Sequence, residues 1–274
     1  MSQRDGYAHG VPCWMAAVQR NPADAVAFYS ELFGWDAENL MPEGEQGDYF
    51  VCRHRGLDVA AIVSVDGAPP PPSSVWATHV WVEDAKGTAH AVQREGGTVV
   101  GEPFESPGGG VVAVLADPAG AVFCAWEPRE RRGAQVVNEP SAWAMSQLIT
   151  DDIDAAKRFY GSVFGWETEE FGMGDARVTL WRVPGYVGGE PQQPVSREVV
   201  AAMAVLTPVD AAAGPSPHWS PDFWIADAEQ AAEQVPGLGG RVVVPPHEVP
   251  PFRRVVLADP EGATFSVSQL LLSG

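Results

Sequence analysis

Residues 27–35 read AFYSELFGW and residues 158–166 read RFYGSVFGW, so one chain carries almost the same nine letters twice. Each copy is predicted to end a helix, because apolar residues recur at helical spacing before a glycine that can take the left-handed conformation. Asn21 and Pro22 are predicted to begin the first helix, and Asp152 is predicted to cap the second. A duplication of this kind decides the fold, because each copy should form the same structural unit.

Further segments repeat in the same order along the chain. EGGTVV (95–100) has its counterpart in LGGRVV (238–243), and VLADPAGAVF (114–123) has its counterpart in VLADPEGATF (256–265). In the second pair, Asp-Pro-x-Gly fits a type I turn, with proline at its second position and glycine at its fourth. The turn joins two β-rich runs, so each copy is predicted to contain a hairpin there.

Each copy also contains a weaker internal repeat, in which a strand, a helix and further strands occur twice. Proline-rich segments separate the two halves, at residues 67–74 in the first copy and 207–221 in the second. Such segments are typical spacers. We therefore predict a first domain over residues 10–127, a linker over 128–140 and a second domain over 141–272, each domain built from two βαβββ modules.

The composition excludes several classes of partner. The chain contains 17 basic and 36 acidic residues, for a net charge of −19. This charge disfavours nucleic acid and anionic membrane surfaces as partners. The three cysteines form no CxxC pair, as expected of a reduced compartment. The first ten residues lack the apolar segment of a secretory signal, and no apolar run could span a bilayer. The sequence thus predicts a cytoplasmic protein.

This arrangement resembles the vicinal oxygen chelate superfamily, which includes glyoxalases, extradiol dioxygenases and bleomycin resistance proteins, and in particular its tandem two-domain, glyoxalase-like members of actinobacteria. The resemblance rests on the FYxxxFGW helix ends, the double glycines and the VLADPxGAxF hairpins. It implies an α+β fold of two tandem glyoxalase-like domains, each with a curved eight-stranded sheet around a cleft. It also implies that metal-binding members hold a divalent ion with His, Glu or Gln on the first and last strands of the modules.

The positions that match these metal slots carry residues of the wrong chemistry. The slot ending the first module of each domain cannot be placed from the sequence. The others fall at Trp14, Ala77, Cys124, Met145, Ser220 and Ser266. Hard divalent ions prefer carboxylate, carbonyl and imidazole ligands. We therefore expect no metal and no cofactor.

Alternation along the strands predicts which side chains share the ligand-binding face. In the first domain these are Trp14, His79, Trp81, Cys124 and Trp126. In the second domain they are Met145, Gln147, Asp222, Trp224, Ser266 and Ser268. His79 and Asp222 are the candidate catalytic acids or bases, and the others are candidate ligand-binding residues. The alternative is that the tryptophans are ordinary core residues and that Asp222 lies in a solvated bend.

Three functions fit these observations. The first is a metal-independent protein or enzyme that acts on or sequesters an aromatic or polycyclic metabolite, in secondary metabolism or drug resistance. The second is a metal-dependent glyoxalase-type lyase or dioxygenase. The third is a degenerate scaffold for protein interaction. For the first we expect a monomer or homodimer, with an aromatic ligand held by three tryptophans in the first domain and held less well, or differently, in the second.

Overall fold

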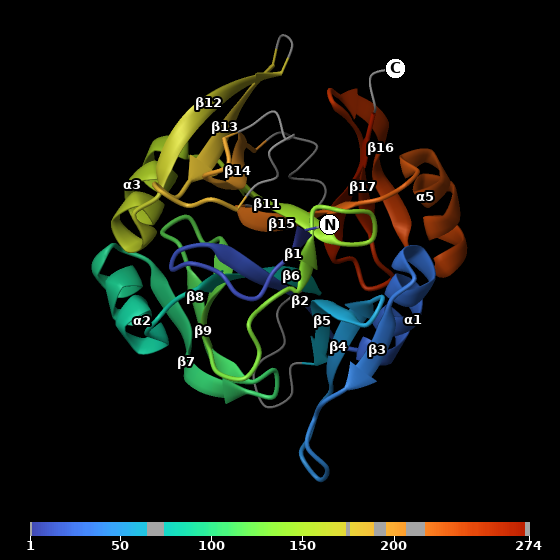
Figure 1. Cartoon of the computed structure of the whole chain (residues 1–274), viewed down its shortest axis with the longest axis horizontal. Helices are drawn as coiled ribbons and strands as arrows, with labels where there is room; N and C mark the ends of the chain where they lie inside the picture. The colour runs from blue at the N-terminus through green and yellow to red at the C-terminus, as the bar shows by residue number, and fades with distance from the viewer. Residues whose placement is uncertain (1, 65–73, 174–175, 189–195, 207–216, 272–274) are drawn as a thin grey trace.

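The computed structural model describes residues 2–64, 74–173, 176–188, 196–206 and 217–271. Residues 67–73 and 207–216 of the two proline-rich spacers, and the end of the predicted second domain at residue 272, lie outside these ranges. Residues 218–221 of the second predicted spacer belong to a strand, which corrects the prediction for them. The described residues form two eight-stranded sheets, one per sequence repeat, and a short two-stranded sheet. This is the predicted α+β fold of two tandem domains (Figure 1).

Domain one holds two modules that meet in the middle of one sheet. The strand order is β3-β4-β5-β2-β6-β9-β8-β7, so the first strands of the two modules, β2 and β6, are central neighbours. The first module comprises β2 (Pro12–Gln19), α1 (Pro22–Phe33), β3 (Asp36–Asn39), β4 (Tyr49–His54) and β5 (Leu57–Ser64). The second module comprises β6 (Val75–Trp81), α2 (Ala85–Arg94), β7 (Thr98–Ser106), β8 (Gly110–Ala116) and β9 (Val122–Pro128).

Domain two repeats this order as β12-β13-β14-β11-β15-β18-β17-β16. Its first module comprises β11 (Trp143–Thr150), α3 (Ile153–Phe164), β12 (Glu167–Met173), β13 (Ala176–Arg182) and β14 (Val199–Val205). Its second module comprises β15 (His218–Trp224), α5 (Ala228–Gln234), η1 (Val235–Leu238), β16 (Arg241–Val249), β17 (Phe252–Ala258) and β18 (Thr264–Leu270). Within the described ranges, no helix has the length and apolar character needed to cross a bilayer.

The repeated nine-residue stretches end helices as predicted. Gly34 and Gly165 follow α1 and α3 in the left-handed conformation, each with φ of 70°. Asp152 caps α3 by accepting a hydrogen bond from the Ala155 amide. Asn21 occupies the N-cap position of α1 as predicted, but its side chain makes no capping hydrogen bond: its side-chain amide donates to Asp24, and its backbone amide donates to Glu261 of the other domain.

Both Asp-Pro-x-Gly segments form the predicted turns between paired strands. The Gly120 amide donates to the Asp117 carbonyl, and the Gly262 amide donates to the Asp259 carbonyl, each at 3.0 Å. The hairpins fix the register of the last two strands in each sheet. They therefore decide which residues of these strands share a face.

The two domains pack crosswise, so that the first module of each domain lies against the second module of the other. In one apolar core, Phe28 and Phe33 of α1 lie with Val235, Leu257 and Phe265 of domain two. In the other core, Phe123 and Val92 of domain one lie with residues of α3. Figure 1 shows the result as two helix pairs on opposite sides of the molecule, α1 with α5 and α2 with α3. Both domains therefore contribute residues to each core.

Residues of the repeated motifs join the domains by hydrogen bonds inside these cores. The Tyr29 hydroxyl donates to Asp259 at 3.0 Å and accepts from the Trp76 indole at 2.9 Å. The second copy forms the same chain, in which Tyr160 donates to Asp117 at 3.1 Å. The FY dipeptide of one repeat thus binds the Asp-Pro turn of the other.

The segment predicted as a linker packs closely against domain one. The Ala134 amide donates to the Cys13 carbonyl, and the Gln135 amide donates to the Asp58 carbonyl. Its strand β10 (Val136–Val137) pairs with β1 (Ser2–Gln3) at the start of the chain. The linker is therefore an ordered strap across domain one.

Candidate functional site

Each sheet has one face against the other domain and one face turned away from it, here called the distal face. On β2, Met15 contacts Ser146 of domain two, so the neighbouring Trp14 points to the distal face. Trp14 pairs with His79, and His79 pairs with Cys124, across three adjacent strands. Met145, Asp222 and Ser266 form the corresponding row in domain two. The structure thus brings together the residues predicted to share each face.

The distal face of domain one is covered. Trp14 and Trp126 are each 1% exposed and belong to a continuous hydrophobic core. Tyr49 on β4 reaches across this face, where its ring would collide with any side chain at Gly108. Arg131 of the strap donates to the Gly108 carbonyl and pairs with Asp58. The strap and the β7–β8 turn therefore close domain one over its tryptophans.

His79 lies deep beneath this cover. Its Nδ1 is 3.1 Å from the Ala77 carbonyl oxygen, which can only accept, so Nδ1 carries the proton. The imidazole stands edge-on to Trp126, with ring centroids 6.1 Å apart. Burial lowers the pKa of His79 from 6.5 to about 4, because the charged form loses its hydration. The imidazole is therefore neutral near pH 7, and a weaker base than an exposed histidine.

Cys124 is chemically inert in this position. It is 4% exposed, and burial raises the pKa of its thiol to about 12. A neutral thiol is neither a nucleophile nor a metal ligand. Cys124 therefore serves as a small apolar side chain in the core.

Domain two carries a polar cluster on its distal face, centred on Arg254 of β17. The Arg254 Nη2 donates to Gln147 Oε1 at 2.9 Å and to Ser266 Oγ at 2.7 Å. Its Nε lies 3.6 Å from Asp222 Oδ1, an ion pair rather than a hydrogen bond. Ser268 donates to the same Asp222 oxygen at 2.8 Å. We call these five residues, from four adjacent strands, the Arg254 cluster.

The Arg254 cluster is partly open to solvent, unlike the covered face of domain one. The side chains of Arg254 and Asp222 are 24% and 15% exposed. Burial raises the pKa of Asp222, while Arg254 and the hydroxyls of Ser268 and Ser266 oppose the rise. Asp222 lies in strand β15, so the alternative of a solvated bend is wrong.

An aromatic pair borders the cluster. Trp224 continues the β15 row beyond Asp222 and pairs with Ser268, while its ring lies 5.8 Å from that of Phe252, tilted by 45°. Met145, the neighbour of Asp222 on β11, is partly exposed. The face therefore combines charged groups with apolar surface, as small-molecule sites do.

A divalent metal does not fit either distal face. The fourth slot, which the sequence left open, can now be assigned to Ala61 on β5 and Ala202 on β14, by pairing with β2 and β11. In domain two, the oxygens of Gln147 and Asp222 already face Arg254, whose charge repels a second cation. Among the described residues, no three His, Cys, Asp or Glu side chains gather as a metal site would require.

Arg254 is the residue that sequence reasoning missed. The predicted hairpin contained the signal, because Arg254 lies four residues before Ala258, on the face shared by Ser266 and Ser268. Its neighbour Arg253 points the other way and pairs with Glu229 of α5 and with Glu248. The two adjacent arginines therefore lie in different environments, on opposite faces of the strand.

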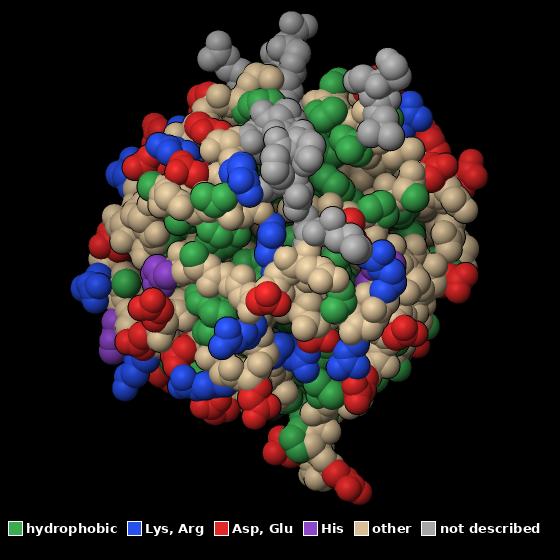
Figure 2. All heavy atoms as spheres, viewed as in Figure 1, with side chains coloured by type: hydrophobic (Ala, Val, Ile, Leu, Met, Phe, Trp, Pro, Cys, Tyr) green, Lys and Arg blue, Asp and Glu red, His purple; other side chains and the backbone are tan. Residues whose placement is uncertain are grey.

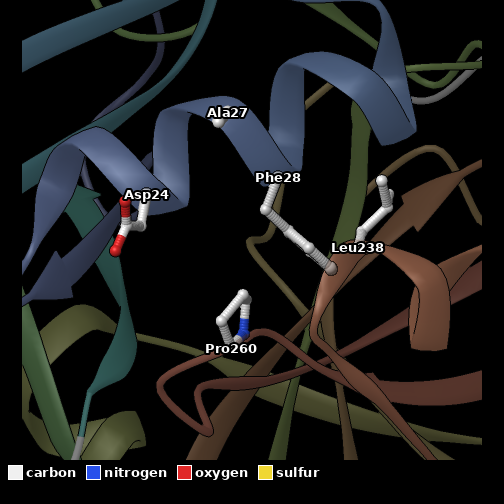
Figure 3. Close-up of a pocket in the computed structure, with 5 residues that line it drawn as sticks. All are labelled: Asp24, Ala27, Phe28, Leu238 and Pro260. Carbon is white, nitrogen blue, oxygen red and sulfur yellow. The ribbon is translucent and has the colours of Figure 1, made fainter.

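A shallow depression elsewhere on the molecule has no comparable chemistry. It lies between α1 of domain one and two turns of domain two, and is lined by Asp24, Ala27, Phe28, Leu238 and Pro260 (Figure 3). Asp24 is the one charged residue there, and it accepts a hydrogen bond from Asn21. On the face of the molecule drawn in Figure 2, acidic and basic side chains are interspersed.

The fold defines a protein of paired βαβββ modules whose two distal faces differ in chemistry. Comparisons with known families agree. Residues 14–125 match the Glyoxalase/Bleomycin resistance protein/Dioxygenase superfamily, and residues 144–268 match a glyoxalase-like domain. The chain belongs to this superfamily.

Two relatives match along nearly their whole length. CFP32 of Mycobacterium bovis, which is named a putative glyoxylase, is 31% identical over 97% of both chains. The anthracycline biosynthesis protein DnrV of Streptomyces peucetius is 30% identical over 96% of this chain and 94% of its own.

Solved structures show the same fold at lower identity. The Mn(II)-bound glyoxalase of Novosphingobium aromaticivorans is 14% identical, with a TM-score of 0.60 over 97% of this chain and 84% of that one. The 2,3-dioxygenase LapB of Pseudomonas sp. KL28 is 16% identical, with a TM-score of 0.59 over 96% of this chain and 93% of that one.

Proposed function

We propose that this protein binds a planar aromatic or polycyclic metabolite on the distal face of domain two, without a divalent metal. The observation that carries the proposal is the Arg254 cluster beside Trp224 and Phe252, partly exposed on a face where related folds bind small molecules. The relationship to an anthracycline biosynthesis protein supports a polycyclic ligand. Whether the ligand is transformed or only sequestered, Asp222 is the candidate acid or base.

This proposal assigns the ligand to domain two, whereas the sequence favoured domain one. The predicted ligand site of Trp14, Trp81, Cys124 and Trp126 stays a prediction, but the cover over Trp14 and Trp126 favours domain two. The indole N–H groups of Trp14 and Trp126 are both buried without an acceptor, a feature that still favours a ligand in domain one.

Quenching of tryptophan fluorescence by 2-naphthamide tests the location. Trp224→Ala removes an aromatic contact and should weaken binding by about tenfold, since such contacts add about 0.5–1.5 kcal/mol beyond area burial. Trp81→Ala is the matched control, because Trp81 is the partly exposed tryptophan of the domain-one row and pairs with Trp126. It should leave the affinity unchanged, and so should treatment with EDTA.

Other outcomes would contradict the proposal. If Trp81→Ala weakens binding and Trp224→Ala does not, the ligand lies in domain one. A requirement for a divalent metal would restore the lyase or dioxygenase alternative. Absence of binding by the folded wild-type protein would contradict small-molecule binding of this class.

A further inference from the structure

Three strands direct polar side chains to one guanidinium. Gln147 comes from β11, Asp222 from β15 and Ser266 from β18, and each contacts Arg254. Two of these, β11 and β15 (Figure 1), are the first strands of the domain-two modules, and the third, β18, is the last strand of the second module. Hydrogen bonds from independent strands hold the Arg254 side chain in one orientation, so its charge is fixed relative to the sheet.

Part of the Arg254 guanidinium is left for a ligand. Its Nη2 is occupied by Gln147 and Ser266, whereas no acceptor for Nη1 occurs among the described residues. Nη1 is not buried, so it is in contact with solvent. An arginine fixed in this way can donate to a carbonyl oxygen without further loss of side-chain freedom.

Asp222 supplies the complementary group. Its Oδ1 accepts from Ser268 and faces Arg254 Nε, whereas no hydrogen bond to its Oδ2 occurs among the described residues. A cation and a carboxylate side by side suit a neutral ligand that carries an acceptor and a donor on adjacent positions. A simple anion suits them less well, because Asp222 would repel it.

We propose that Arg254 and Asp222 together bind a carbonyl and an adjacent hydroxyl on a planar ring, and that the guanidinium supplies the positive charge that a metal ion supplies elsewhere in the superfamily. The carbonyl accepts from Arg254 Nη1, and the hydroxyl donates to Asp222. Trp224 and Phe252 border the same site and contact the ring. This inference rests on the proposed function and names the ligand class of that site.

The test compares 3-hydroxy-2-naphthamide with its methyl ether, 3-methoxy-2-naphthamide, by fluorescence titration of the full chain. The ether keeps the ring and the carbonyl but cannot donate to Asp222. Because hydrogen bonds to charged groups are the strong ones, the wild type should prefer the hydroxyl compound by about tenfold or more. The preference should persist in EDTA.

Variants test the preference and the affinity at the two residues. Asp222→Asn should reduce the preference to about twofold or less, since it removes the charged acceptor of the hydroxyl. Arg254→Met should instead weaken the binding of both compounds by about tenfold, since both carry the carbonyl that Arg254 binds. Arg254→Lys keeps the charge but not the planar fork, and should give an intermediate loss of affinity. Arg253→Met is the matched control, because Arg253 is the next residue on β17 but pairs with Glu229 and Glu248.

The outcomes separate the two hypotheses. If the wild type binds both compounds equally, or if folded Arg254→Met binds them as tightly as the wild type does, this inference is overturned and the proposed function stands. If the wild type binds neither compound, nor 2-naphthamide, both are overturned. If Arg254→Met does not fold, Arg254→Lys and Asp222→Asn decide: an unchanged affinity in Arg254→Lys together with an unchanged preference in Asp222→Asn overturns the inference.

Discussion

His79 and Asp222 occupy corresponding positions in the two sheets, and burial shifts their pKa values in opposite directions. The pKa of His79 falls to about 4, and that of Asp222 rises above its ordinary value. The cause is the same in both, because loss of water disfavours whichever form is charged. At a pH near its ordinary pKa, each side chain is therefore neutral more often than the same side chain would be in water.

The shift at His79 predicts a loss of stability in acid. Between the unfolded pKa of 6.5 and the folded pKa of about 4, the unfolded chain binds a proton at this histidine and the folded chain does not. Stability from this group is therefore present above pH 6.5 and lost as the pH falls toward 4. The loss is about 3 kcal/mol, at 1.36 kcal/mol per pKa unit.

Urea unfolding of the wild type and His79→Asn from pH 7 to pH 4 measures this contribution. Asparagine can still donate to Ala77 but does not titrate, so the variant should lose stability less steeply over this range. His247→Asn is the control, because His247 makes a similar contact to the Pro245 carbonyl on an exposed strand. Equal slopes for the wild type and His79→Asn would contradict the prediction.

At the scale of elements, the sequence predicted local structure well and long-range contacts poorly. The helix ends at Gly34 and Gly165 and the Asp-Pro turns follow from local conformational preferences, and all of them are confirmed. The Arg254 cluster depends on the register between strands, which the hairpin fixes but which no local pattern around Arg254 indicates. The cover over domain one depends on the strap, whose contacts with Cys13 and Asp58 no local pattern indicates.

The duplicated Tyr–Asp contacts should differ in strength. Asp259 accepts from both Tyr29 and Gln19, at 3.0 and 2.7 Å, whereas the same oxygen of Asp117 accepts from Tyr160 alone among the described side chains. Tyr160→Phe therefore leaves a mostly buried carboxylate oxygen without a donor. It should cost about 2–3 kcal/mol, and Tyr29→Phe about 1 kcal/mol less.

Urea unfolding of both variants at neutral pH checks this order. The two substitutions are chemically identical and each also leaves one indole N–H without its acceptor, Trp76 or Trp219, so that cost cancels in the comparison. Gln19→Ala combined with Tyr29→Phe should bring the first site to the level of the second. A larger loss for Tyr29→Phe than for Tyr160→Phe would contradict the argument.

At the scale of the whole molecule, neither domain holds a complete core. Phe28 of α1 lies against Phe265 of domain two, with ring centroids 6.3 Å apart. A Cβ at Gly240 would lie 2.6 Å from the Ala258 carbonyl oxygen of the same domain and 2.9 Å from the Phe28 ring of the other domain. The second glycine thus allows close packing both within domain two and between the domains, and the two sequence repeats should fold as one unit.

This crosswise packing predicts that a destabilising substitution in one domain lowers the stability of both. Phe28→Ala removes a buried ring of domain one that contacts domain two, and should cost about 3–5 kcal/mol. The protein should still unfold in a single transition, and hydrogen exchange should accelerate by similar factors in β2 and in β18, because the strands open only when the shared core opens. Phe104→Ala is the control, since Phe104 is 49% exposed on β7 and should change neither. Two separate transitions, or faster exchange confined to domain one, would show that the domains are energetically independent despite their interlocked cores.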